Sequence, residues 1–344
     1  MNKPKRKIKL VFINGLKRIV LKEINQYPAF CIIKKGIDFI HLDFTQNFNQ
    51  ITHLKSVLRV HIIVQNPKYN PRYIANHKLV LGSLIDVVLK NQKNKFKTFG
   101  IICAGSNSPN IRSISKYVQD KYKLTEEQEK ADLKIHIIKT NNIWEVGVQI
   151  TPRPLSLRNY KIRNISGAMN PTIAYAVNSL CKPEKANSYL NICSGSATLL
   201  IEAAQCFPNL KQLVGFDNNK KTISLAIQNI RKAGLIKRIQ LKEKDIFNKP
   251  ELGRFDIITS DLPFGMSISK NKNLEKLYQY FIEYCQEILN YDGRLAIYIS
   301  DHEMLKEIIS KSKFKIIKTV KLKFLTSVNA YLRPKIFICK LKQN

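Results

Sequence analysis

The chain has 344 residues, which is too long for one ordinary hydrophobic core, so we expect two or three domains. It is 44% hydrophobic and 24% charged, a composition that excludes an intrinsically disordered protein. The 58 Lys and Arg residues outnumber the 25 Asp and Glu residues, and the net charge of +33 favours a polyanionic partner such as nucleic acid. A lysine-biased proteome is the alternative explanation of the same charge.

The seven cysteines are scattered, mostly within apolar runs, and show no paired spacing. We therefore expect reduced thiols, with neither a disulfide framework nor a zinc site. No apolar run reaches the roughly 18 residues of a membrane-spanning helix, and the basic start of the chain lacks the core of a signal peptide. These features predict a cytoplasmic protein that holds no metal ion and does not enter a membrane.

The first part of the chain mixes short strands and helices, which predicts α+β structure. In residues 1–56 we expect strands at 8–13, 30–33 and 39–44, a helix at 16–26 and a helical stretch that ends near Leu54. In residues 57–150 we expect strands at 57–64, 99–103, 133–138 and 143–150, a helix at 73–90 and another from Ile111 onward. The helix from Ile111 follows a turn of small polar residues that can receive phosphates, so Arg112 and Lys116 are candidate RNA contacts.

Residues 151–166 are expected to be a linker, because Pro152 and Pro154 cannot continue a β-ladder. Arg158 and Arg163 lie on this linker and are further candidate RNA contacts. The last domain, 167–344, begins with a helix capped by Asn170, and then β and α patterns alternate. We expect strands at 189–192, 212–216, 240–243, 255–259, 293–300 and 331–341, and helices at 199–206, 220–233 and 274–289. This alternation predicts a doubly wound, mostly parallel α/β sheet.

A turn of small residues follows the first strand of this sheet, where a doubly wound sheet binds its ligand. Its candidate cofactor contacts are Asn191, Ser194, Gly195, Ser196 and Thr198. The pattern is neither the G-x-G-x-x-G of a dinucleotide site nor a P-loop. Carboxylates follow the next two strands. Asp217 can accept both ribose hydroxyls of a nucleoside, and Asp245 can accept from an adenine amino group, although each could be only a cap or turn residue.

The fourth strand ends in Asp261-Leu262-Pro263-Phe264, which places an acceptor beside a flat ring. Asp261 and the carbonyl near Pro263 can accept from an exocyclic amino group, while Phe264 stacks on the base. We therefore assign these three residues as the candidate catalytic group. A strand end with a proline turn and a core phenylalanine is the structural alternative.

Several motifs along the chain belong together: 191–204, 261–265, the Asn14-Gly15-Leu16 start, and 154–160 followed by 170–174. Together they resemble the S-adenosylmethionine-dependent, THUMP-containing RNA guanine-N2 methyltransferases. The resemblance implies a Rossmann-like methyltransferase domain, preceded by a ferredoxin-like domain at 1–56 and a THUMP-like RNA-binding domain at 57–150. It also implies S-adenosylmethionine as cofactor and RNA as partner. The partner is expected to be tRNA, since the Leu262-Pro263 form of the motif resembles the tRNA enzymes of the family more than the rRNA enzymes. We expect the protein to act as a monomer.

The chain departs from the family pattern at two positions. An acidic residue is usual where Asn191 stands, and glycine is usual where Ala197 stands. Three alternatives accompany the tRNA prediction, and these two departures motivate the last of them. They are an rRNA guanine-N2 methyltransferase, an adenine-N6 DNA methyltransferase, against which the THUMP-like half argues, and a catalytically weakened RNA-binding or assembly protein.

Overall fold

The computed structural model describes residues 5–45, 48–91, 96–103, 108–140, 142–163, 165, 167–262, 271–300, 302–325 and 330–342, with the backbone alone at 271–273. The chain divides into two compact units. Unit 1 comprises Met1–Phe12 and Val20–Ser156, and unit 2 comprises Ile13–Ile19 and Leu157–Asn344. Within the described residues, no helix is long and apolar enough to cross a membrane.

Unit 1 is built on an eight-stranded sheet in the order β2-β3-β1-β4-β8-β7-β5-β6. The strands are β1 (Lys7–Val11), β2 (Ile32–Lys35), β3 (Phe39–Asp43), β4 (Arg59–Asn66), β5 (Thr98–Cys103), β6 (Thr125–Glu126), β7 (Leu133–Thr140) and β8 (Ile143–Gln149). The helices are α1 (Lys17–Ile24), whose residues before Val20 belong to unit 2, α2 (Phe48–Thr52), α3 (Ile74–Asn91) and α4 (Pro109–Tyr122). Because β1 pairs with β4, one sheet runs across the predicted domain boundary at residues 56 and 57. The names ferredoxin-like and THUMP-like for the two parts stay predictions.

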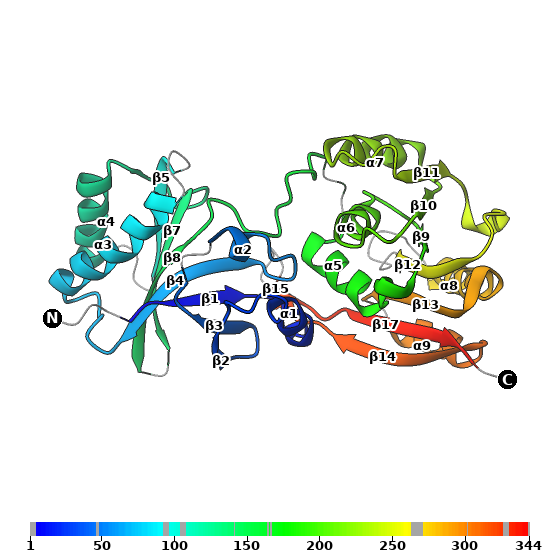
Figure 1. The fold of residues 1–344 in the computed structure, drawn as a ribbon, viewed down its shortest axis with the longest axis horizontal. Helices are drawn as coiled ribbons and strands as arrows, with labels where there is room; N and C mark the ends of the chain where they lie inside the picture. The colour runs from blue at the N-terminus through cyan, green and yellow to red at the C-terminus, as the bar shows by residue number, and fades with distance from the viewer. Residues whose placement is uncertain are drawn as a thin grey trace. The chain divides into compact units, whose positions relative to one another are not determined.

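Helices α3 and α4 lie together over one face of the unit 1 sheet (Figure 1). Helix α4 begins where its sequence predicts. Ser108 is extended and its side chain accepts from the Ile111 amide, and Pro109 occupies the first turn, where a missing N–H has no cost. The hydrophobic positions Ile111, Ile114 and Val118 are buried, which leaves Arg112 and Lys116 exposed.

Unit 2 is a seven-stranded sheet in the order β11-β10-β9-β12-β13-β17-β14, so the predicted doubly wound, mostly parallel architecture is confirmed. The strands are β9 (Ser188–Ile192), β10 (Gln212–Asp217), β11 (Ile239–Glu243), β12 (Phe255–Asp261), β13 (Leu289–Ile299), β14 (Phe314–Lys321) and β17 (Lys335–Leu341). A separate two-stranded sheet pairs β15 (Phe324–Leu325) with β16 (Tyr331–Leu332). The five strands from β11 to β13 are parallel, whereas β17 runs antiparallel to β13 and β14.

Helices cover both faces of this sheet (Figure 1). They are α5 (Pro171–Leu180), α6 (Thr198–Cys206), α7 (Lys220–Lys232), α8 (Asn271–Ile288) and α9 (His302–Ser310), with short 3-10 helices η1 (Pro183–Lys185) and η2 (Ile246–Asn248). Helices α8 and α9 bury one apolar cluster with Leu190, Ile258 and Leu295 of the sheet. On the opposite face the Tyr189 hydroxyl donates to Asn178 of α5 (2.7 Å). The strand order reverses between β9 and β12, which is the point where such sheets bind ligands.

Candidate active site

A cavity of about 670 Å³ lies at the carboxyl ends of β9, β10, β11 and β12. It brings together the three carboxylates that the sequence predicts, Asp217, Asp245 and Asp261, although they lie at or just after the ends of three different strands. The other described lining residues are Cys193, Phe216, Asn218, Lys244, Ile246, Phe247, Leu274, Lys276 and Leu277. The sequence prediction missed these residues. Asn218, Lys244 and Ile246 are next to the predicted carboxylates in the sequence, so their position at the strand ends could have identified them as lining residues.

The turn after β9 has left-handed backbone at alternate residues. The φ angles are +54° at Cys193, +51° at Gly195 and +61° at Ala197. Only glycine adopts this region without strain, so the other two residues store backbone strain at the site. A Cβ placed on Gly195 would meet no atom within 4 Å, so a ligand can approach this stretch of backbone closely. The turn therefore fits a ligand that needs an exposed main chain.

The hydroxyl groups of the turn form hydrogen bonds with other groups of the same turn. The Ser194 hydroxyl donates to the Asn191 carbonyl (2.8 Å), and the hydroxyls of Ser196 and Thr198 bond each other (2.8 Å). All three side chains are buried, and none belongs to the described lining of the cavity. They fix the shape of the turn in this structure, and their direct contact with a cofactor stays a prediction.

Asn191 is almost fully buried, and its amide group holds two strands together. Its Nδ2 donates to the Thr259 carbonyl of β12 (3.1 Å), whereas its Oδ1 has no hydrogen-bond partner in the described part of the protein. An acidic residue could not donate to that carbonyl, which is a physical reason for an amide here. The unpartnered Oδ1 is an acceptor that a bound amino group could use.

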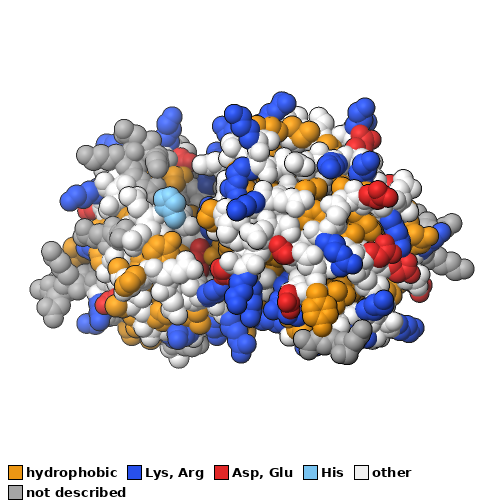
Figure 2. Space-filling model, turned by 45° about the vertical axis from the view of Figure 1, so that its right-hand side comes forward, with side chains coloured by type: hydrophobic (Ala, Val, Ile, Leu, Met, Phe, Trp, Pro, Cys, Tyr) orange, Lys and Arg blue, Asp and Glu red, His pale blue; other side chains and the backbone are white. Residues whose placement is uncertain are grey.

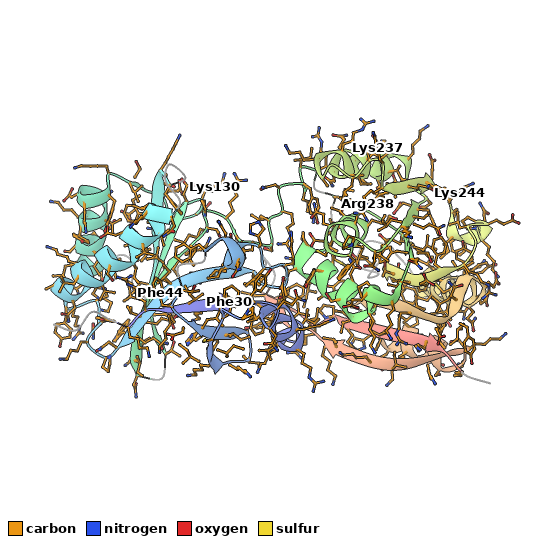
Figure 3. All side chains as sticks on the ribbon, viewed as in Figure 1. Phe30, Phe44, Lys130, Lys237, Arg238 and Lys244 are labelled. Atoms are coloured by element: carbon orange, nitrogen blue, oxygen red, sulfur yellow. The ribbon has the colours of Figure 1, made fainter. Side chains whose placement is uncertain are left out.

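The two carboxylates that follow β10 and β11 are partly satisfied. Asp217 accepts from the Gly195 amide (2.9 Å) and from the Asn219 amide (3.1 Å), so it links the turn to the end of β10. Asp245 accepts from the Phe247 amide (3.0 Å) as the cap of η2, and Lys244 precedes it directly after β11 (Figure 3). Each carboxylate has further lone pairs on the cavity side of the strand ends, which suit hydroxyl and amino donors.

Asp261 ends β12 between the ends of β9 and β13. The neighbouring Ser260 hydroxyl donates to the Ile192 carbonyl (2.8 Å), and the Leu262 amide donates to the Tyr298 carbonyl (3.3 Å). Removal of bulk water around Asp261 raises its pKa to about 8, although the Lys161 ammonium lowers it. A carboxyl group with such a pKa is a capable proton acceptor near neutral pH. Pro263 and Phe264 lie outside the described residues, so their predicted roles stay predictions.

Cys193 lines the same cavity, but its thiol is a poor nucleophile. Burial and the carboxylates Asp217, Asp261 and Asp245 raise the pKa of the thiol. A thiolate is therefore scarce at neutral pH. The described residues also contain no group of three or more His, Cys, Asp or Glu side chains that could hold a metal ion.

The four candidate RNA contacts occupy different environments. Arg112 and Lys116 are exposed on α4. The Arg158 side chain is 9% exposed, and its Nε lies 3.0 Å from Oε1 of the fully buried Glu202. Arg163 is exposed but donates from Nε to Gln228 (2.7 Å) of α7. Lys and Arg side chains are spread over the face in Figure 2 rather than gathered over one element.

Residues 158–328 match the protein-family model described as "RMKL-like, methyltransferase domain". The chain is 30% identical over 188 residues to the U6 snRNA (guanine-N(2))-methyltransferase THUMPD2 of Bos taurus, covering 52% of this chain and 35% of that protein. It is 28% identical over 190 residues to the tRNA (guanine(6)-N(2))-methyltransferase THUMP3 of Bos taurus, covering 51% of this chain and 37% of that protein. The chain thus spans about a third of the length of these curated relatives.

The whole fold is similar to a crystal structure of TrmN from Thermus thermophilus. The TM-score is 0.79 at 18% sequence identity, and the superposition covers 98% of this chain and 100% of that one. The likeness therefore extends over both units of the chain, including the part outside the family match.

Proposed function

We propose, from the match of residues 158–328 to the RMKL-like methyltransferase domain family, that the protein is an S-adenosylmethionine-dependent RNA methyltransferase that forms N2-methylguanosine in tRNA. The observation that carries the proposal is the convergence of Asp217, Asp245 and Asp261 on one cavity at the switch point of the sheet. Both relatives described above are named as guanine-N2 methyltransferases, one for U6 snRNA and the other for tRNA.

The residues around the cavity fit this cofactor. Asp217 would accept from the ribose hydroxyls and Asp245 from the adenine amino group. Gly195 lies outside the described lining, but its open side leaves room for a ligand to approach the backbone. Asn191 is buried and lies outside the described lining of the cavity, and its proposed role is that the unpartnered Oδ1 accepts from an ammonium group. When bound, S-adenosylmethionine supplies an electrophilic methyl group on a sulfonium.

Asp261 would orient the methyl acceptor. The amino nitrogen of guanine is a weak nucleophile, because its lone pair is delocalised into the ring. An ionised Asp261 accepts an amino N–H, and the carbonyl near Pro263 is proposed to accept the other, which fixes the direction of the nitrogen. The nitrogen would become acidic as it takes the methyl group and the sulfonium leaves as a neutral thioether, and Asp261 would accept its proton because the pKa of Asp261 is about 8. Phe264 is proposed to stack on the guanine.

The burial of Ala197 argues against a catalytically silent protein. Its side chain is fully buried and lies outside the described lining of the cavity, so its methyl group does not narrow the space for a cofactor. The left-handed φ of +61° is that of a glycine position, which explains why glycine is usual there. Calorimetric titration with S-adenosylmethionine tests this point, since a silent protein would give no binding heat.

Unit 1 is proposed to bind the phosphates of the RNA, and Arg112 and Lys116 on the exposed side of α4 are proposed contacts. Binding should weaken steeply with salt, and an affinity unchanged over a several-fold rise in salt would contradict it. We also propose that the protein is a cytoplasmic monomer, which cell fractionation and light scattering test.

The deciding experiment is mass spectrometry of nucleosides from tRNA and rRNA of a deletion strain. Loss of N2-methylguanosine from tRNA, restored by the wild-type gene but not by Asp261→Asn, supports the proposal. Loss from rRNA alone would instead favour the ribosomal alternative. Unchanged N2-methylguanosine in both pools would refute guanine methylation.

A further inference from the structure

One buried side chain joins the linker to the turn that follows β9. Asn229 of α7 is 0% exposed. Its Oδ1 accepts from the Arg163 amide (2.9 Å), and its Nδ2 donates to the Arg163 carbonyl (3.1 Å) and to the Ser196 carbonyl (3.4 Å). The oxygen and both N–H groups of the Asn229 amide are thus in use, and they bond two segments that are distant in the sequence.

The linker is attached to unit 2 at two points. The Arg158 guanidinium and the Tyr160 hydroxyl both donate to Oε1 of the buried Glu202 on α6, at 3.0 and 2.9 Å. Asn229 makes the second attachment, because it bonds both the N–H and the C=O of Arg163 in the manner of a neighbouring strand. This second attachment is the one that also reaches the turn.

At the turn, Asn229 bonds a peptide group that is next to a strained residue. The Ser196 carbonyl belongs to the peptide bond that precedes Ala197, whose φ is +61°. The N–H of the same peptide bond donates to the Ser194 carbonyl (2.8 Å). A left-handed residue other than glycine persists only where surrounding contacts determine its conformation. Because the peptide group is bonded at both its C=O and its N–H, Asn229 is one of the contacts that keep the turn in this form.

We propose, on the basis of the proposed function, that Asn229 is a positioning residue that holds the turn in the form that binds S-adenosylmethionine and couples the turn to the linker. Gly195, next to Ser196, has an open side where a ligand can approach the main chain. Asn229 itself is buried and outside the described lining of the cavity, so it acts through the Ser196 carbonyl. Because the same amide bonds Arg163, a cofactor that fixes the turn should also stabilise the bond to the linker.

The first test of this coupling needs no substitution. Deuterium exchange of the Arg163 amide reports the opening of its bond to Asn229, and NMR can follow it in the full-length protein with and without S-adenosylmethionine. We expect saturating cofactor to slow this exchange by about threefold or more. The Lys313 amide is the control, because it also donates to a side-chain amide oxygen, that of Gln286 (2.6 Å), and neither residue lines the cavity. Exchange of the Arg163 amide that is equally fast with and without cofactor would overturn the proposal.

The second test separates positioning from stability. Asn229→Ala removes all three bonds. Asn209→Ala is the matched control, since Nδ2 of Asn209 donates to the carbonyls of Pro183 (2.6 Å) and Ala186 (2.7 Å), and none of these residues lines the cavity. Both variants should lower the urea midpoint. In calorimetry at a temperature where both are folded, we expect about tenfold weaker cofactor binding for Asn229→Ala and an unchanged Kd for Asn209→Ala.

The outcomes distinguish the role of Asn229 from the proposed function. A cofactor Kd that changes no more in Asn229→Ala than in Asn209→Ala refutes the role of Asn229, whatever the losses of stability. If Asn229→Ala does not fold, the exchange measurement on the wild-type protein still decides. If the wild-type protein itself binds no S-adenosylmethionine, the proposed function fails, and the inference fails with it.

Discussion

Replacement of Arg158 by methionine should strongly destabilise unit 2, because it leaves a buried carboxylate without its cation. Glu202 is 0% exposed and receives hydrogen bonds from Arg158 and Tyr160. Removal of one partner of a buried ion pair typically costs about 3–5 kcal/mol. Because the Tyr160 hydroxyl remains as a donor, we expect the lower end, about 3 kcal/mol. For a unit of this size that corresponds to a fall in Tm of roughly 6–12 °C.

The single tryptophan of the chain helps to assign the loss to one unit. Trp144 lies on β8 in unit 1, so its emission follows the unfolding of that unit, whereas circular dichroism follows both units. Arg158→Met should shift the urea transition seen by circular dichroism. Lys311→Met is the matched control, because it breaks an exposed pair with Glu307 and should give no measurable change.

Two outcomes would refute the reasoning about Arg158. In the Arg158→Met/Glu202→Met double variant, two apolar side chains replace the pair, so the loss should be smaller than the sum of the single losses. Additive losses would show that the two side chains are not coupled. The salt dependence of RNA binding should also stay unchanged in Arg158→Met. A reduced slope with unchanged stability would mean that Arg158 contacts phosphate after all.

Much of unit 2 could be predicted from the sequence, because short stretches of sequence specify its helix starts and strand ends. The Asn170-Pro171 pair predicts the start of α5, and the structure has the Asn170 side chain accepting from the Thr172 amide (2.8 Å). Strands that end in Asp217 and Asp261 predict a shared site, because parallel strands bring their carboxyl ends to the same edge. Local patterns and one topological rule therefore suffice for the position of the carboxylates.

Partners that are distant in sequence could not be predicted. Glu202 reads as an ordinary helix residue, and its pairing with Arg158 depends on a contact 44 residues away. Glu145 of unit 1 is similar, since it is buried and its partners come from other strands. Its Oε1 lies 2.6 Å from the Lys9 Nζ and 2.9 Å from the His136 Nε2. Burial alone would raise the pKa of Glu145, but these two partners lower it to about 2. No pattern along the chain identifies such groups.

Helix α9 and strand β14 are among the elements that the sequence did not predict, because their sequence signals are weak. Helix α9 buries only Leu305 and Ile309 among its described residues, too short a repeat for a helical period. Strand β14 is an edge strand whose exposed lysines interrupt the alternation of a strand, and such lysines also discourage pairing with other chains. Tertiary packing against α8 and β17 determines both elements.

Three further predictions concern the cavity. Asp217→Ala should weaken binding of S-adenosylmethionine by about 10–100-fold in calorimetry, because it removes charge-assisted hydrogen bonds and frees the Gly195 amide; an unchanged Kd contradicts this role. Ala197→Gly should leave cofactor binding intact and change the free energy of unfolding by less than about 1 kcal/mol, since relief of the left-handed strain offsets the added flexibility of the unfolded chain; urea titration measures it. The rate of methylation should rise with pH through about 8, because the pKa of Asp261 is raised to about 8 by burial and only the ionised carboxylate accepts the amino hydrogens of guanine. A raised pKa means that the proton is still bound at pH 7, so activity is gained, and not lost, as pH increases. Single-turnover rates measured from about pH 6 to 9.5 should show this rise in wild type and in the control variant Lys306→Met, which removes an exposed lysine of α9. Asp261→Asn should be inactive throughout. A flat wild-type profile over that range would show that Asp261 does not act through its ionised form.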